Sequence, residues 1–142
     1  MNNAVMSGFP RLHQTVIDAT DVRSAAEFYR ELFDLVYRPG DEPPTDGRRD
    51  ETQWLVLRQR DGSGALAFQH VDEMERTTWP EPDVPMQLHL DCTVPDADEL
   101  RRHRARAEAL GATLLLDRFD DPQEPLFVMA DPEGHPFCLF VG

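Results

Sequence analysis

The sequence predicts an α+β protein that consists of two copies of a strand–helix–three-strand module. The main observation is an internal repeat in which Leu12–Arg23 resembles Gln87–Leu100, and Gln14 and His89 each stand seven residues before an aspartate. Gln87–Val94 alternates polar and apolar residues, which is the period of a strand, and both stretches then run into a helical pattern. Two copies of roughly seventy residues are too few and too long for a solenoid, so two βαβββ modules are favoured.

The first module covers about residues 11–70. The repeat predicts a strand over Leu12–Ala19, and an apolar stripe at helical spacing predicts a helix over Arg23–Phe33, for which Asp21 or Ser24 can cap the N-terminus. A short apolar run follows at 35–37. Proline, glycine and charged residues make 38–50 a loop. Residues 53–59 and 65–70 then form a hairpin around the Asp61–Gly64 turn.

A linker of about residues 71–85 leads into the second module, about residues 86–142. We expect this linker to pack across the sheet with Trp79 as its apolar anchor. The second module repeats the order of the first: a strand over 87–94, a helix over 96–110 capped by Asp96 or Asp98, a strand over 112–116, and a hairpin of 126–130 with 136–141. The linker is short for a tether, so residues 1–142 are expected to form a single domain.

Composition narrows the classes of partner. The chain has 14 Lys and Arg against 27 Asp and Glu, and its net charge is −13. Nucleic acids and anionic membranes are bound mainly through Lys and Arg, so neither is an expected partner. No apolar run approaches the ~20 residues of a membrane span, and the first residues lack the pattern of a signal peptide. Two cysteines give no disulfide framework, so the cytoplasm is the expected location.

Three motifs carry a resemblance to a known family. FYRELF at Phe28–Phe33, HLD at His89–Asp91 and DPEGHPFCLF at Asp131–Phe140 resemble the vicinal-oxygen-chelate superfamily. More narrowly, they resemble its bacterial glyoxalase-like proteins, of the glyoxalase/bleomycin resistance/dioxygenase type. The resemblance extends from about Leu12 to Val141. It implies two βαβββ modules whose curved mixed sheets surround a cavity, often in a homodimer.

The resemblance also implies positions for a metal site. Members that bind metal take one ligand from the first strand and one from the last strand of each module. The first-strand positions are Gln14 and His89, and the last-strand position of module two is Cys138, where the family usually has Glu. In module one the corresponding position is Ala67 or Phe68, with Gln69 nearby. Because no carboxylate stands at either last-strand position, we expect no cofactor. If a divalent ion is bound, the predicted ligands are His89, Gln14 and Cys138.

The function favoured by the sequence is binding of a small organic molecule in the cavity of a homodimeric protein. An acidic surface favours cationic ligands. The residues predicted to contact the ligand are Gln14, Asp18, Trp54, Phe68, Gln69, His89 and Cys138. Several of them also have a structural interpretation, such as His89 as a hydrogen-bonded polar residue and Cys138 as a small buried apolar one.

Two alternatives stay open at this point. The first is a metal-dependent lyase, isomerase or dioxygenase in which His89 and Asp91, which share one face of their strand, form the catalytic pair. The second is an interaction module that has lost the use of its cavity. The sequence does not decide whether the protein is an enzyme.

Overall fold

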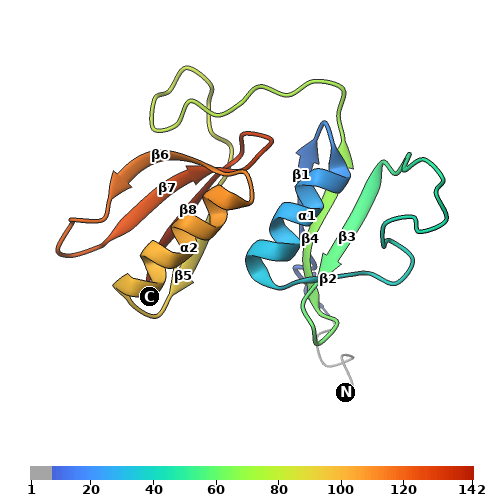
Figure 1. Cartoon of the computed structure of the whole chain (residues 1–142), viewed down its shortest axis with the longest axis horizontal. Helices are drawn as coiled ribbons and strands as arrows, with labels where there is room; N and C mark the ends of the chain where they lie inside the picture. The colour runs from blue at the N-terminus through green and yellow to red at the C-terminus, as the bar shows by residue number, and fades with distance from the viewer. Residues whose placement is uncertain (1–7) are drawn as a thin grey trace.

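The computed structural model describes residues 8–142, and it confirms two βαβββ modules that lie side by side (Figure 1). The linker crosses between them at the top of that view. Module one contains β1 (Thr15–Ala19), α1 (Val22–Phe33), β2 (Val36–Tyr37), β3 (Trp54–Arg58) and β4 (Gly64–His70). Module two contains β5 (Leu90–Val94), α2 (Ala97–Ala109), β6 (Thr113–Arg118), β7 (Leu126–Ala130) and β8 (Pro136–Val141).

The two sheets have the same topology and remain separate. Their strand orders are β1-β4-β3-β2 and β5-β8-β7-β6, and in each the first strand runs parallel to the last while the other pairs are antiparallel. Equivalent places in the two copies carry different residues: Val16 is the register partner of Ala67, whereas Asp91 is the register partner of Cys138. The repeat is therefore confirmed in the backbone, whereas the side chains at equivalent positions differ in chemistry.

Both helices begin where the sequence places a capping aspartate. The Ser24 N–H donates to Asp21 at 3.0 Å, and the Glu99 N–H donates to Asp96 at 2.8 Å. Each carboxylate satisfies an amide that has no partner inside its helix. Within residues 8–142, no helix combines the length and apolar character that crossing a membrane requires.

The first strand of each module starts three residues later than the sequence predicts. β1 starts at Thr15 rather than Leu12, and β5 starts at Leu90 rather than Gln87. In module two the parallel partner β8 begins at Pro136, which lacks an N–H and cannot extend the ladder. Without a partner strand the preceding residues leave the sheet, and Leu88 is 59% exposed.

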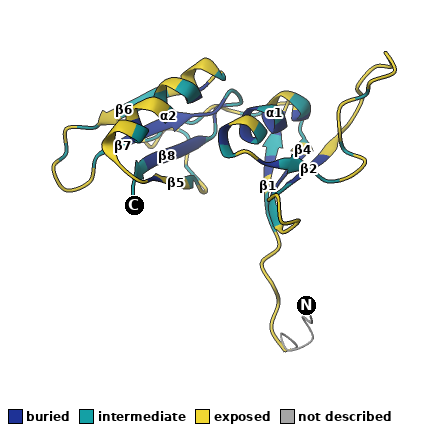
Figure 2. Ribbon diagram, turned by 60° about the horizontal axis from the view of Figure 1, so that its bottom comes forward, coloured by how far each residue is buried: buried dark blue, intermediate teal, exposed yellow. Residues whose placement is uncertain are grey.

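One hydrophobic core joins the two modules. The inner face of α1 packs on the β1–β4 sheet, and the rings of Phe28 and Tyr29 also lie 5.9 and 6.4 Å from the ring of Phe137 on β8. Figure 2 shows the buried residues along the strands and the inner helix faces, and the exposed residues on the outer helix faces and the loop before β3. α1 is therefore shared between the modules.

The turn between β7 and β8 makes a buried polar contact with module one. Asp131 in this turn is 1% exposed. Its carboxylate accepts the Tyr29 hydroxyl at 2.6 Å and the N–H groups of Glu133 and His135 at 2.8 and 3.0 Å. Burial and the nearby Asp131 charge raise the pKa of Tyr29 well above its ordinary value, so the hydroxyl stays a donor.

Two more residues of the same turn reach module one. The Glu133 carboxylate accepts the Thr20 and Asp21 N–H groups, at 2.6 and 3.2 Å, just before α1 starts. The His135 Nε2 lies 2.7 Å from the Asp18 carbonyl oxygen at the end of β1. We call residues 131–135 the joint turn, because they fix the end of β1 and the start of α1 against module two.

Candidate functional site

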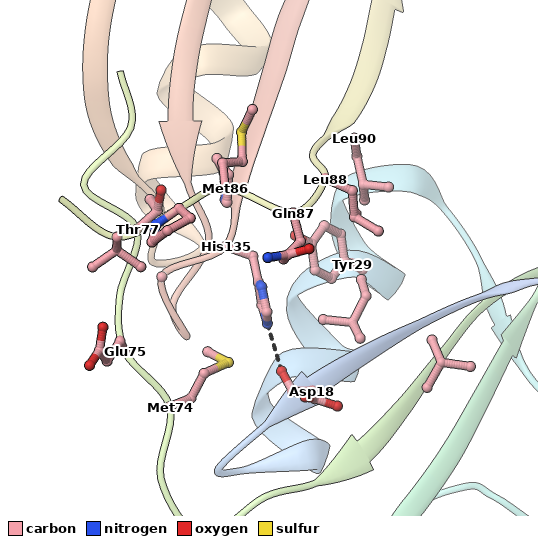
Figure 3. A pocket seen from close by; sticks show the side chains of 16 residues that line it. Asp18, Tyr29, Met74, Glu75, Thr77, Met86, Gln87, Leu88, Leu90 and His135 are labelled. Carbon is pink, nitrogen blue, oxygen red and sulfur yellow. Dashed lines mark hydrogen bonds between the residues drawn. The ribbon is translucent and has the colours of Figure 1, made fainter. Parts of the chain in front are cut away.

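A cavity of about 320 Å³ lies between the linker and the two modules (Figure 3). We call it the linker cavity. The linker and the residues that follow it form one wall, and β1, α1 and the joint turn form the others. Its apolar lining includes Val16, Ile17, Met74, Val84, Met86, Leu88 and Leu90, and its polar lining includes Asp18, Glu75, Gln87 and His135. It is a mostly apolar hollow with a few convergent polar groups, as small-molecule sites usually are.

The His135 ring points toward Asp18 in this cavity, and the dashed line in Figure 3 marks its contact with the Asp18 carbonyl oxygen. Asp18 Oδ1 accepts a hydrogen bond from Gln69 Nε2 at 2.7 Å, which orients the carboxylate. The His135 Nε2 faces the Asp18 carbonyl oxygen, which can only accept, so Nε2 carries the proton in this contact. A neutral His135 then has Nδ1 as its acceptor.

A second cluster forms on the open face of the module-two sheet, the face that α2 does not cover. Ligand-type atoms of His89, Asp91 and Cys138 all lie within 4.8 Å of one another. The His89 Nε2 is 3.1 Å from Asp91 Oδ1, and the Trp79 ring stacks on the His89 ring with 5.0 Å between centroids. The predicted linker anchor thus packs on the histidine and limits how its ring can turn.

The thiol in this cluster is not activated as a nucleophile. Cys138 is 4% exposed, and burial, together with the negative charge of Asp91, raises its pKa to about 11. A thiol with this pKa is protonated at neutral pH, and the thiolate is the nucleophilic form. The other cysteine, Cys92, packs against the core on the opposite face of β5, where burial raises its pKa to about 12.

The other residues predicted to contact a ligand fall in different places. Gln14 directly precedes β1, and its buried Oε1 has no hydrogen-bond partner among the described residues. Trp54 is 37% exposed and is the register partner of Gln69, which in turn holds Asp18. Phe68 is fully buried in the core, with its ring stacked 5.9 Å from the Tyr29 ring. Strand alternation turns Phe68 toward α1, so it supports the core.

Sequence reasoning missed most of the linker cavity. Glu75, Gln87 and His135 line it, and none of them is among the predicted site residues. They come from segments that are far apart in the chain. The only early signal was the expectation that the linker packs across the sheet, because that packing is what encloses the space.

The residues present do not fit the four-position metal site that the resemblance implies. In module one, Ala67 offers only a methyl group at the last-strand position, and the Phe68 ring lies in the core. The first-strand position is the neutral amide of Gln14. A site that draws equally on both modules is therefore incomplete, whereas His89, Asp91 and Cys138 come together within module two alone.

Comparisons with known proteins agree with this architecture. The chain matches the family "Glyoxalase-like domain" over residues 14–140. A glyoxalase/bleomycin resistance protein/dioxygenase family enzyme from Burkholderia phytofirmans PsJN superposes with a TM-score of 0.66 at 16% identity, covering 93% of this chain and 98% of that one. The fosfomycin resistance protein FosX from Mesorhizobium loti gives 0.60 at 17%, covering 94% and 92%.

A FosX from Listeria monocytogenes, in complex with Mn(II) and a sulfate ion, gives a TM-score of 0.62 at 16% identity and covers 94% of this chain and 93% of its own. Comparison with curated protein sequences gave no match. Structural likeness at these identities shows the fold, and the family match extends over most of the chain. The protein belongs to the glyoxalase-like domain family of the vicinal-oxygen-chelate superfamily.

Proposed function

We propose that this glyoxalase-like protein binds a small organic molecule in the linker cavity. The observation that carries the proposal is the cavity itself, with its volume of about 320 Å³, its apolar walls and its polar groups from three segments. This volume is at the lower end of the ~300–1,000 Å³ typical of ligand sites, so the ligand is drug-sized or smaller.

The charge of the cavity favours an amine. Asp18 and Glu75 place two carboxylates in the lining, and the whole chain carries a net charge of −13. An ammonium group would pair with Asp18, while a hydrocarbon body would pack on the apolar wall. Anionic ligands such as phosphonates would be repelled by the same charges.

Asp18→Asn is expected to weaken amine binding about 10- to 100-fold, because a charge-assisted hydrogen bond is replaced by a neutral one. A thermal-shift screen of small aromatic and aliphatic amines, with carboxylates and phosphonates of matched size, identifies a probe, and calorimetry measures its Kd. The matched control is Asp83→Asn, which removes a charge from an exposed part of the linker. Tighter binding of the acids than of the amines, or equal losses in both variants, would contradict the proposal.

The second candidate is a metal-dependent lyase, isomerase or dioxygenase. The observation that favours it is the cluster of His89, Asp91 and Cys138, in which His89 can serve as a ligand or a base and Asp91 as its acid–base partner. Turnover of a glyoxalase or dioxygenase substrate that appears only with added metal, and disappears in His89→Ala, would move this candidate ahead of the first.

Homodimer formation also belongs to the proposal. Three large apolar side chains, Val16, Trp54 and Leu88, are 42%, 37% and 59% exposed. β1 and β5 each form an edge of their sheet, so their outer sides have no partner strand within it. A second copy of the chain would cover both features.

Light scattering after gel filtration is expected to give a mass of about twice the 16.2 kDa of one chain. Trp54→Glu, which places a charge in the expected interface, should shift the protein toward the single-chain mass. Ala105→Glu adds the same charge on the exposed side of α2 and should leave the mass unchanged. A single-chain mass for the unmodified protein at all concentrations would rule out the dimer.

A further inference from the structure

We infer that module two alone holds a zinc-class divalent ion through His89, Asp91 and Cys138. This inference shares residues with the second candidate function above, but it concerns binding of the ion and requires no turnover. It departs from the two-module site that the family resemblance implies, because all three ligands come from β5, β8 and the residue before β5.

Strand pairing brings the three groups together. Asp91 and Cys138 are register partners on β5 and β8, so their side chains leave the sheet side by side on one face. His89 precedes Asp91 by two residues and shares that face. The three ligand atoms lie within 4.8 Å of one another. Around a tetrahedral zinc they would be separated by about 3.3–3.8 Å, given metal–ligand bonds of roughly 2.0–2.3 Å, so small side-chain rotations close the site.

The repeat supplies an internal control for this assignment. The places of His89, Asp91 and Cys138 are taken in module one by Gln14, Val16 and Ala67. The same strands and the same register therefore carry one neutral amide and two aliphatic side chains, so module one offers no comparable set. The imidazole, carboxylate and thiol converge in only one copy, so they are not a by-product of the fold.

The sulfur, nitrogen and oxygen donors of this cluster favour zinc among the divalent metals. Zinc binding would displace the proton of the Cys138 thiol, and the resulting thiolate, together with an imidazole, favours zinc over manganese, which prefers oxygen ligands. Three protein ligands leave one tetrahedral position for water or a small molecule. The Trp79 ring, stacked on His89, fixes the plane of the imidazole and thus prepares the ligand geometry before an ion arrives.

Titration of the metal-free, reduced full-length protein tests the inference. ZnCl₂ is expected to bind at one ion per chain in competition with a chromophoric chelator, and MnCl₂ should bind at least 100-fold more weakly. His89→Ala, Asp91→Asn and Cys138→Ala should each weaken zinc binding about 100-fold. CoCl₂ should give a thiolate-to-cobalt charge-transfer band that is lost in Cys138→Ala.

Two control variants distinguish this zinc site from binding at the second thiol or at the module-one position. Cys92→Ala removes the other thiol, one residue from Asp91 but on the opposite face of β5, and should leave zinc binding and the cobalt band unchanged. Gln14→Ala should also have no effect. Circular dichroism of each metal-free variant checks that it folds. No zinc binding, tighter binding of manganese, or a loss in Gln14→Ala equal to that in His89→Ala would each overturn the inference.

Discussion

Asp131→Ala is expected to lower the free energy of unfolding by about 3–5 kcal/mol, because the substitution leaves one buried and two partly buried donors without an acceptor. These donors are the Tyr29 hydroxyl and the N–H groups of Glu133 and His135. Asp131 is 1% exposed, so water cannot easily replace the carboxylate. Each unsatisfied buried donor costs roughly 1–3 kcal/mol.

Urea unfolding followed by circular dichroism measures this loss. Asp131→Asn keeps one oxygen acceptor and should fall between the alanine variant and the unmodified protein. The control is Asp120→Ala, which removes an exposed carboxylate and should change stability by less than about 0.5 kcal/mol. If Asp131→Ala is no less stable than Asp120→Ala, the joint turn does not stabilise the fold.

Phe137→Ala is the second large effect, with an expected loss of about 3–5 kcal/mol, typical for removing a fully buried aromatic side chain. Phe137 is 0% exposed, and its ring lies against Phe28 and Tyr29 of the other module. The substitution therefore opens a cavity in the part of the core that both modules share.

The matched control for this variant lies on the same strand. Phe140 is three residues further along β8, on the opposite face and only partly buried, so Phe140→Ala should lose clearly less than Phe137→Ala. Unfolding followed by tryptophan fluorescence and by circular dichroism should give coincident transitions for the unmodified protein. Equal losses for both variants would show that the shared core contributes little.

The sequence predicted the module order because its local signals agree with one another. The alternation before Asp96 and the matching stretch before Asp21 indicate two strands, and the same aspartates cap the two helices. The starts of the strands were less predictable. Their limits depend on where the partner strand begins, and Pro136 sets that limit for β5.

The candidate sites were predictable to different degrees. His89 and Asp91 share a face because side chains in a strand alternate, so their proximity could be read directly from the sequence. Their proximity to Cys138 depends on the register between β5 and β8, which a single sequence does not specify. The linker cavity depends on the path of the linker, which is held by contacts such as Arg76 Nη1 with the Pro132 carbonyl oxygen at 2.9 Å. Such a contact leaves no periodic pattern.

The joint turn also has a counterpart in module one. At the same place in the first hairpin, the Asp61 carboxylate accepts the Ser63 N–H at 2.8 Å, as Asp131 accepts that of Glu133. Both are Asx-type turns, in which an aspartate side chain bonds the backbone two residues on. Asp61 is exposed, whereas Asp131 is buried against Tyr29.

In a duplicated fold the relative orientation of the halves is ambiguous, because the halves resemble each other and could associate in more than one way. This chain resolves the ambiguity by giving a docking partner to one of two locally similar turns. Within the joint turn, one set of contacts thus closes the hairpin, and another set fixes the mutual orientation of the halves. Substitutions at the first turn need only preserve closure of the hairpin, whereas substitutions at the second turn also alter how the halves fit together.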